Sequence, residues 1–318
     1  MVSHRFLLKN NAEIKEHEAM NDNYEVYEGI THLKLQKLLY PFKIIYSVEA
    51  KKKIERVLED FRPDVVHINN FNFQLTPSIL YGIKQYRKKA KRDVRIIYTA
   101  HDSQLVCPNH LMQNPITGER CQQCLGKDSI ACMKNKCIHG STVKSVLAAF
   151  ENKLYDRLRT YDLFDAIICP SYFLKEKLDT NIVLRAKTTV LHNFVNKESI
   201  DKVEKEDYVL FFGRFSKEKG IETLVKVCKE LPQIPFYFAG AGPLQALVEE
   251  CSNIKNLGFL RGKDLYTTIA KARFTVFPSE CYENCPFTVM ESQIYGTPVI
   301  GTRMGGIPEL LEEEVTGQ

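Results

Sequence analysis

Long apolar runs are missing from this sequence of 318 residues, although 44% of its residues are hydrophobic. No run approaches the roughly 20 residues that a membrane-spanning helix needs, so the pattern of such a helix is excluded. Charged residues interrupt the segment 1–18 throughout, which excludes the pattern of a signal peptide. We therefore expect a cytoplasmic protein.

A strong charge imbalance is also missing, since the formal net charge is +5. A charge of this size does not by itself call for a nucleic-acid partner. Internal repeats and low-complexity tracts are absent, which excludes a repeat architecture. What remains is a chain long enough for two hydrophobic cores, and two domains are the natural expectation.

Cysteine, in contrast, is plentiful, with ten residues in the chain. Five of them lie outside the cysteine-rich segment 107–139 and are scattered along the chain: Cys169, Cys228, Cys251, Cys281 and Cys285. Their surroundings are typical of an enzyme, and disulfide frameworks belong to small secreted domains. We therefore expect reduced thiols.

Apolar segments that predict strands alternate with segments that predict helices, in two series. The strands expected in the first series are 64–68, 94–99, 166–169 and 188–191, and those in the second are 209–212, 235–239, 256–260, 274–277 and 299–301. This alternation implies an α/β protein with two doubly wound halves facing a cleft. A charged linker at 197–207 separates the series, and we place the domains at 1–204 and 205–318.

The segment 213–220, Gly-Arg-Phe-Ser-Lys-Glu-Lys-Gly, lies between the first strand and the first helix of the second half. Such a loop presents backbone amides at a helix N-terminus, where Arg214 and Lys219 can neutralise a diphosphate. A solvated basic turn is the alternative for so short a motif. The segment 240–243 lacks the third glycine of a dinucleotide fingerprint, and we interpret it as a packing turn.

The stretch 274–309 carries two glutamates around a predicted helix start. Glu283 lies in a polar loop, the helix begins near Pro286, and Glu291 lies on its second turn. A helix N-terminus with a carboxylate on either side suits a ligand that carries both phosphate and hydroxyl groups. Two glutamates at this spacing are common by chance, so the prediction depends on the whole stretch 274–309.

Together these motifs resemble the nucleotide-binding domain of a family-4 glycosyltransferase of the two-domain GT-B type. The matching pieces occur in family order: 213–220, 240–243, 278–279, 283–291, 296–299 and 305–309. The first half resembles the branch of the family that builds bacterial surface polysaccharides. Its matching pieces are 63–67, 99–102, the cysteine-rich segment 107–139, 170–171 and 192–193.

The resemblance implies transfer of a sugar from a nucleotide-sugar donor to a glycan or lipid-linked acceptor, with retention of configuration, in polysaccharide biosynthesis. Arg214 and Lys219 would bind the diphosphate and stabilise it as it leaves. Glu291 would accept hydrogen bonds from the ribose hydroxyls, while Glu283 and His101 would lie near the transferred sugar, His101 from the other half. The remaining donor-binding positions are Gly213, Cys285, Pro286 and Phe287.

The implied chemistry needs no cofactor, because cationic side chains and a helix N-terminus compensate the charge of the leaving diphosphate without a metal ion. Retention by same-face attack means that Glu283 and Glu291 are not the acid and nucleophile of a glycoside hydrolase. His101 on its own has a structural alternative, as a histidine at a strand end. His67, within an apolar strand, is interpreted as structural.

Cys121, Cys124, Cys132 and Cys137 have the spacing of thiolate ligands, which suits a structural zinc site. The unequal gaps and the nearby Cys107 favour the alternative of free thiols on a loop. We do not expect a catalytic use of these cysteines.

The run 86–92 is densely basic and ends a predicted helix. A solvated helix end is one interpretation. The other is peripheral contact with the inner membrane face, where lipid-linked acceptors reside. Nucleic-acid binding through this run and the cysteine-rich segment lacks the aromatic platforms or recognition helix that it needs.

The resemblance also implies that both ends are shortened, so that the first domain lacks its initial strand unit and the second its terminal helices. A non-catalytic fragment that binds a nucleotide-sugar or a partner without turnover is therefore an alternative function. A nucleotide-sugar epimerase on the same architecture is another, against which the segments 213–220 and 283–291 argue. The sequence does not identify the sugar, the nucleotide or the acceptor.

Overall fold

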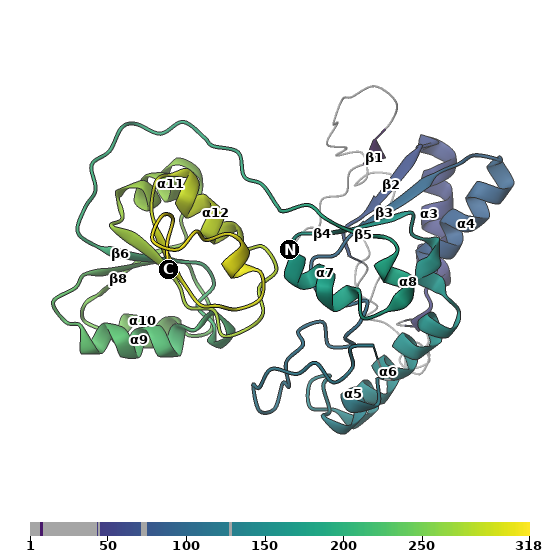
Figure 1. The fold of residues 1–318 in the computed structure, drawn as a ribbon, viewed down its shortest axis with the longest axis horizontal. Helices are drawn as coiled ribbons and strands as arrows, with labels where there is room; N and C mark the ends of the chain where they lie inside the picture. The colour runs from purple at the N-terminus through teal and green to yellow at the C-terminus, as the bar shows by residue number, and fades with distance from the viewer. Residues whose placement is uncertain (1–6, 9–42, 44, 71–74, 127–128) are drawn as a thin grey trace, which may run out of the picture. The chain divides into compact units, whose positions relative to one another are not determined.

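The computed structural model describes residues 7–8, 43, 45–70, 75–126 and 129–318 (Figure 1). The chain divides into two compact units. The first comprises Met1–Cys169 and Lys175–Val190, and the second comprises Pro170–Leu174 and Leu191–Gln318. The domain boundary expected after residue 204 stays a prediction.

The first unit is built on a five-stranded sheet in the order β1-β2-β3-β4-β5. Strands β2 to β5 run parallel, whereas β1 pairs antiparallel with β2 at the edge. The strands are β1 (Leu7–Leu8), β2 (Val65–Ile68), β3 (Arg95–Thr99), β4 (Ala166–Cys169) and β5 (Thr188–Val190). Its helices are α3 (Val48–Phe61), α4 (Ser78–Ala90), α5 (Ile130–Lys134), α6 (Thr142–Arg157) and α8 (Ile182–Arg185), with a 3-10 turn η1 (Thr160–Leu163). Helix α7 (Tyr172–Leu178) is divided between the units after Leu174.

Helix α3 shows how local chemistry sets the ends of an element. Ser47 is the N-cap, and its hydroxyl accepts a hydrogen bond from the Ala50 amide at 3.1 Å. Arg62 ends the helix in the left-handed conformation, with a φ of 48°. Val57 and Leu58 lie on the buried face and pack into the core.

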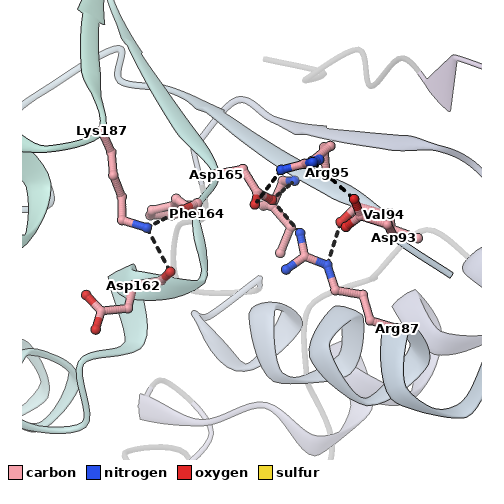
Figure 2. Close-up of polar contacts among 9 residues, drawn as sticks. Arg87, Asp93, Val94, Arg95, Asp162, Phe164, Asp165 and Lys187 are labelled. Atoms are coloured by element: carbon pink, nitrogen blue, oxygen red, sulfur yellow. Dashed lines mark hydrogen bonds and ion pairs between the residues drawn. The ribbon is translucent and has the colours of Figure 1, made fainter. Parts of the chain in front are cut away.

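The start of β4 is tied to β3 and α4 through Asp165 (Figure 2). Its Oδ2 atom accepts a hydrogen bond from the Ile96 amide at 2.7 Å and pairs with the guanidinium of Arg87. Arg87 also donates to the carbonyl oxygen of Val94 at 2.5 Å. One carboxylate therefore ties β3, β4 and α4 together.

Three of the five cationic side chains in the basic run 86–92 are ion-paired within their own unit. Arg87, Lys89 and Arg92 each form an ion pair, and their partners are Asp165, Glu59 and Asp64 respectively. These pairs leave less charge to attract an anionic membrane. The structure therefore favours the interpretation as a solvated, ion-paired helix end.

The second unit is built on an all-parallel sheet in the order β10-β9-β6-β7-β8. The strands are β6 (Val209–Phe212), β7 (Phe236–Ala239), β8 (Ile254–Gly258), β9 (Phe274–Phe277) and β10 (Val299–Gly301). The helices are α9 (Ile221–Glu230), α10 (Gln245–Glu249), α11 (Gly262–Lys271) and α12 (Phe287–Ile294), with 3-10 turns η2 (Lys217–Lys219) and η3 (Ile307–Glu309).

The central strand β6 is buried on both faces, because successive side chains point to opposite sides of a sheet. Val209 and Phe211 belong to a core cluster with residues of α9 and α10. Leu210 and Phe212 belong to a second cluster with residues of α11. Figure 1 shows α9 and α10 on one side of this sheet and α11 and α12 on the other. The doubly wound arrangement expected from the sequence is confirmed.

The strand order of the second sheet reverses direction at β6. The chain proceeds from β6 through β7 to β8 on one side, and then continues with β9 and β10 on the other. Ligands of open α/β sheets bind at such a switch point, beyond the carboxyl ends of the strands. The loops that follow β6 and β9 lie there. Within the portion of the chain that the structure describes, every helix is too short or too polar to cross a bilayer.

Candidate functional site

Two loops meet at the carboxyl edge of the second sheet, one at 213–220 after β6 and one at 278–286 after β9. Gly220 has a φ of 73°, and a Cβ atom there would lie 1.9 Å from the carbonyl oxygen of Pro278. The Glu280 amide donates to the carbonyl oxygen of Glu218 at 3.0 Å. Only glycine permits so close an approach, so the two loops form one backbone unit.

These loops bring together Lys219 and Glu283, two residues predicted as catalytic. The Nζ atom of Lys219 pairs with Oε1 of Glu283, and the buried hydroxyl of Ser279 donates to the same oxygen at 2.8 Å. The side chain of Glu283 is 14% exposed and that of Lys219 is 28% exposed. Ser279 was not predicted as a partner of Glu283, although the Pro278–Ser279 motif was a signal for it.

A third loop, after β10, fixes the backbone of Glu283. The Gly306 amide donates to the carbonyl oxygen of Glu283 at 2.7 Å. Gly305 has a φ of 63°, and a Cβ atom there would lie 2.1 Å from that oxygen. The glycines of the 305–309 motif therefore allow this loop to pack directly against the loop that carries Glu283.

Glu291 lies on the second turn of α12 with its carboxylate half-buried. Among the residues that the structure describes, no hydrogen bond or ion pair reaches this carboxylate. Burial raises the pKa of Glu291 above its ordinary value, because it disfavours the charged form. Hydroxyl donors of a ligand would stabilise that form. The residue therefore suits the ribose-binding role that the family resemblance implies, which stays a prediction.

The start of α12 follows the same loop and so lies at the same edge. Its N-cap is Pro286, whose side chain makes no capping hydrogen bond. Cys285 is buried and its carbonyl oxygen accepts from Asn193 Nδ2 at 2.9 Å, while Phe287 is 52% exposed. Backbone amides at a helix N-terminus without a side-chain cap can receive an anion.

Gly213 and Arg214 open the loop after β6. The Gly213 amide donates to the carbonyl oxygen of Ala239 at 3.0 Å, which continues the pairing of β6 with β7. Arg214 is exposed, and within the described residues its guanidinium makes no hydrogen bond or ion pair. This guanidinium, Lys219 and the α12 amides can hold an anion, while Glu291 can accept hydrogen bonds from hydroxyl groups.

His101 belongs to the first unit and lies just beyond the carboxyl end of β3. Its Nε2 atom lies 3.2 Å from Asn69 Oδ1. Partial burial lowers the pKa of His101, although the nearby Asp102 carboxylate opposes this shift. The ring is therefore mainly neutral at pH 7 and keeps part of its surface exposed. His67, interpreted as structural, pairs its Nε2 atom with Thr99 Oγ1 at 2.7 Å.

A polar network that was not predicted lies beside His101. Asn70, with a φ of 71°, donates to Asp102 Oδ2 at 3.1 Å and accepts from the Tyr98 hydroxyl at 2.7 Å. His110 Nδ1 lies 3.6 Å from the same Asp102 oxygen. The only signal in the sequence was that Asp102 directly follows His101. The network fixes the chain that carries the histidine.

The cysteines of the segment 107–139 are free thiols that gather in the first unit. Burial and neighbouring sulfur atoms raise the pKa of Cys124 to about 11, and burial also raises the pKa of Cys107, Cys132 and Cys137. Neutral thiols are poor nucleophiles, which agrees with the absence of a predicted catalytic role. Among the described residues, no three Cys, His, Asp or Glu side chains already stand in a metal-binding arrangement. The zinc site stays a prediction.

Two family models together match residues 15–318. The model described as Glycosyltransferase Family 4 matches residues 15–199, and the model described as Glycosyl transferases group 1 matches residues 193–318. Their junction lies close to the expected linker.

Individual relatives agree with these models. An uncharacterized glycosyltransferase of Methanocaldococcus jannaschii is 29% identical over 209 residues, which are 62% of this chain and 57% of that protein. An uncharacterized 42.6 kDa protein in a cps region of Klebsiella pneumoniae is 26% identical over 299 residues, which are 90% of this chain and 70% of that protein. The chain thus spans little more than half the length of the archaeal relative.

A solved structure shares the fold. The Anabaena protein HepE, crystallised in complex with UDP, superposes with a TM-score of 0.55 at 17% identity, over 84% of this chain and 66% of that protein. At this identity the likeness concerns the fold alone. It agrees with the GT-B architecture expected from the sequence.

Proposed function

The chain belongs to glycosyltransferase family 4, and from this premise we propose that it transfers a sugar from a nucleotide-sugar donor to a glycan or lipid-linked acceptor. Retention of configuration and a role in polysaccharide biosynthesis belong to the same proposal. The observation that supports it is the pairing of Lys219 with Glu283 between two loops at the switch point of strand order, one of which leads into the helix carrying Glu291.

The donor would bind at this edge through complementary groups. The ribose hydroxyls would donate to Glu291, whose half-buried carboxylate is then stabilised by hydrogen bonds. The diphosphate would lie against the first turn of α12, near Pro286 and Phe287, with Arg214 as a mobile counter-charge. Gly213 would allow the backbone to approach the phosphates, because it carries no side chain.

Lys219 and Glu283 would carry the chemistry of the transfer. Breaking the bond to the sugar leaves negative charge on the diphosphate, and a nearby ammonium group lowers the energy of that state. A diphosphate would compete with Glu283 for Lys219, since both are anions. The freed carboxylate, still held by Ser279, could then accept a hydrogen bond from a sugar hydroxyl.

Retention would follow from attack on the face that the diphosphate leaves. A retaining glycosidase would instead need one carboxylate as a nucleophile at the sugar carbon. The ion pair of Glu283 with Lys219 does not favour that role. His101 is proposed to contact the transferred sugar, a role that rests on its place beyond β3 and on its largely neutral ring.

The two halves of the chain would bind different substrates. We propose that residues 205–318 bind the donor, because the groups suited to phosphate and ribose lie there. Residues 1–204 would select the acceptor. A nucleic-acid partner does not belong to the proposal, and contact with a membrane would come through a lipid-linked acceptor rather than through the ion-paired run 86–92.

The test is a transfer assay on the full 318-residue chain with a panel of radiolabelled nucleotide-sugars and membrane extract as the acceptor source. Labelled glycan together with released nucleoside diphosphate supports the proposal. Donor binding without turnover would instead establish the non-catalytic alternative. Release of an epimerised donor in the absence of acceptor would establish the epimerase alternative. Absence of donor binding would refute all three.

A further inference from the structure

The cysteine-rich segment 107–139 has a very small apolar core of its own. One short helix, α5, packs there against α6, and most of the remainder consists of turns. The buried members of its cluster are Cys124, Cys132, Cys137 and Ala149, joined by the partly buried Ala131, Met133 and Ile138. A small apolar cluster rarely holds an insertion of this kind without a covalent or metal cross-link.

Five cysteines of this segment line a single cavity. They are Cys107, Cys121, Cys124, Cys132 and Cys137. Four of them form two close pairs along the chain, and the turn at Lys136, with a φ of 48°, places Cys137 beside Cys132. The Cys137 amide donates to the carbonyl oxygen of Cys132 at 3.1 Å. The backbone therefore gathers the thiols without help from a disulfide.

Cys107 and Cys121 have different polar neighbours. The Cys107 thiol donates to Asn109 Oδ1 at 3.0 Å, a closer acceptor than the Ser145 carbonyl oxygen, to which the Cys132 thiol donates at 3.9 Å. Cys121 is different, because the Asn135 side-chain amide points its N–H toward the sulfur at 4.0 Å. An N–H donor beside sulfur stabilises a thiolate, as outer-shell donors do in metal sites.

We propose that Cys121, Cys124, Cys132 and Cys137 bind one zinc ion as a closed, structural tetrathiolate site, with Cys107 outside it. The four sulfur atoms do not already form a coordination sphere in the described structure, so binding requires their side chains to rotate on the present backbone. Each thiol gives its proton to solvent as its sulfur joins the metal. No oxidant is involved.

The zinc site would stabilise the first unit, in the region that follows His101. The Cys121 amide donates to the carbonyl oxygen of Met112 at 2.8 Å, and the Ser103 hydroxyl donates to that of His110 at 2.6 Å. These contacts connect the cysteine-rich segment to the chain that follows His101. A metal cross-link would therefore support the position of the histidine without touching a substrate.

The test measures metal content in the full chain, purified with a reductant and without a chelator. We expect about one zinc ion per chain by mass spectrometry. Cys132→Ser and Cys121→Ser should lower this content to less than about a tenth. Two matched controls, Cys107→Ser beside the site and Cys228→Ser in the second unit, should keep it.

A second measurement covers variants that fail to fold. Wild-type protein freed of metal by a chelator should regain thermal stability when zinc is added, and four fewer thiols should react with a thiol reagent in the loaded form. The proposal would be overturned if the thermal stability of metal-free protein did not change when zinc is added. So would a disulfide among these cysteines in freshly alkylated protein, or one zinc ion per chain retained by Cys132→Ser.

Discussion

The carboxyl edges of the two sheets are held in different ways. In the second unit, glycines at 220, 305 and 306 let neighbouring loops touch through their backbones. In the first unit, the chain near His101 is held by side chains, through Asn70, Tyr98 and Asp102. A backbone contact between glycine and a carbonyl oxygen tolerates no added atom, whereas a hydrogen-bonded side chain can be exchanged at moderate cost. The donor-side edge should therefore be the more sensitive of the two.

Gly220→Ala should give the largest effect, because the new methyl group would meet the Pro278 carbonyl oxygen at 1.9 Å and the φ of 73° disfavours alanine. We expect a loss of about 3 kcal/mol in the free energy of unfolding, measured by urea titration with circular dichroism. Gly296→Ala is the matched control, with a φ of 72° but no atom within 4 Å, and should lose only about 1 kcal/mol. Equal losses would show that the loop contact contributes nothing.

Lys219→Ala comes next and acts on chemistry rather than on folding. The change removes the cation at the leaving diphosphate and leaves Glu283 without its ion pair. Turnover should fall by about 100- to 1000-fold in the transfer assay. Lys217→Ala, an exposed lysine of the same loop, should keep wild-type turnover. Unchanged turnover in Lys219→Ala would remove this residue from the site.

The residues at the carboxyl edges of the two sheets could be predicted from the sequence to different extents. Lys219, Glu283 and Glu291 were predicted from the family motif, and the strand Val209–Phe212 from its apolar run. The pairing of Lys219 with Glu283 was not predicted, because 64 positions separate them and only the fold brings them together. The tie between Asn70 and Asp102 was hidden for the same reason. Strand β1 was missed because two residues show no periodicity and depend on β2 for their pairing.

Glu151 should make the stability of the first unit depend on pH. Burial raises the pKa of Glu151 to about 7, against 4.5 as its ordinary value, so the folded first unit holds an extra proton between these values. Stability is therefore lost as the pH rises from about 4.5 through 7. Glu151→Gln should match the wild type at pH 4.5 and exceed it by about 2 kcal/mol at pH 8 in urea titrations. Glu176→Gln, at an exposed carboxylate, should show no such pH trend.

Asn70→Gly should give the smallest effect. Glycine accepts the φ of 71°, so the variant loses only the hydrogen bonds to Tyr98 and Asp102. We expect a loss of about 1 kcal/mol in unfolding free energy, and Asn70→Ala should lose about 1 kcal/mol more because of backbone strain. A loss as large as that of Gly220→Ala would contradict the difference drawn between the two edges.

Calorimetric titration of the full chain with UDP, GDP and ADP tests the donor site most directly. At least one nucleoside diphosphate should bind the wild type. Glu291→Ala should weaken that binding by about tenfold or more, because the ribose loses a charged acceptor. Asp102→Asn, in the first unit, should leave it unchanged. Wild-type affinity in Glu291→Ala, or equal losses in both variants, would contradict a nucleotide site at the edge of the second sheet.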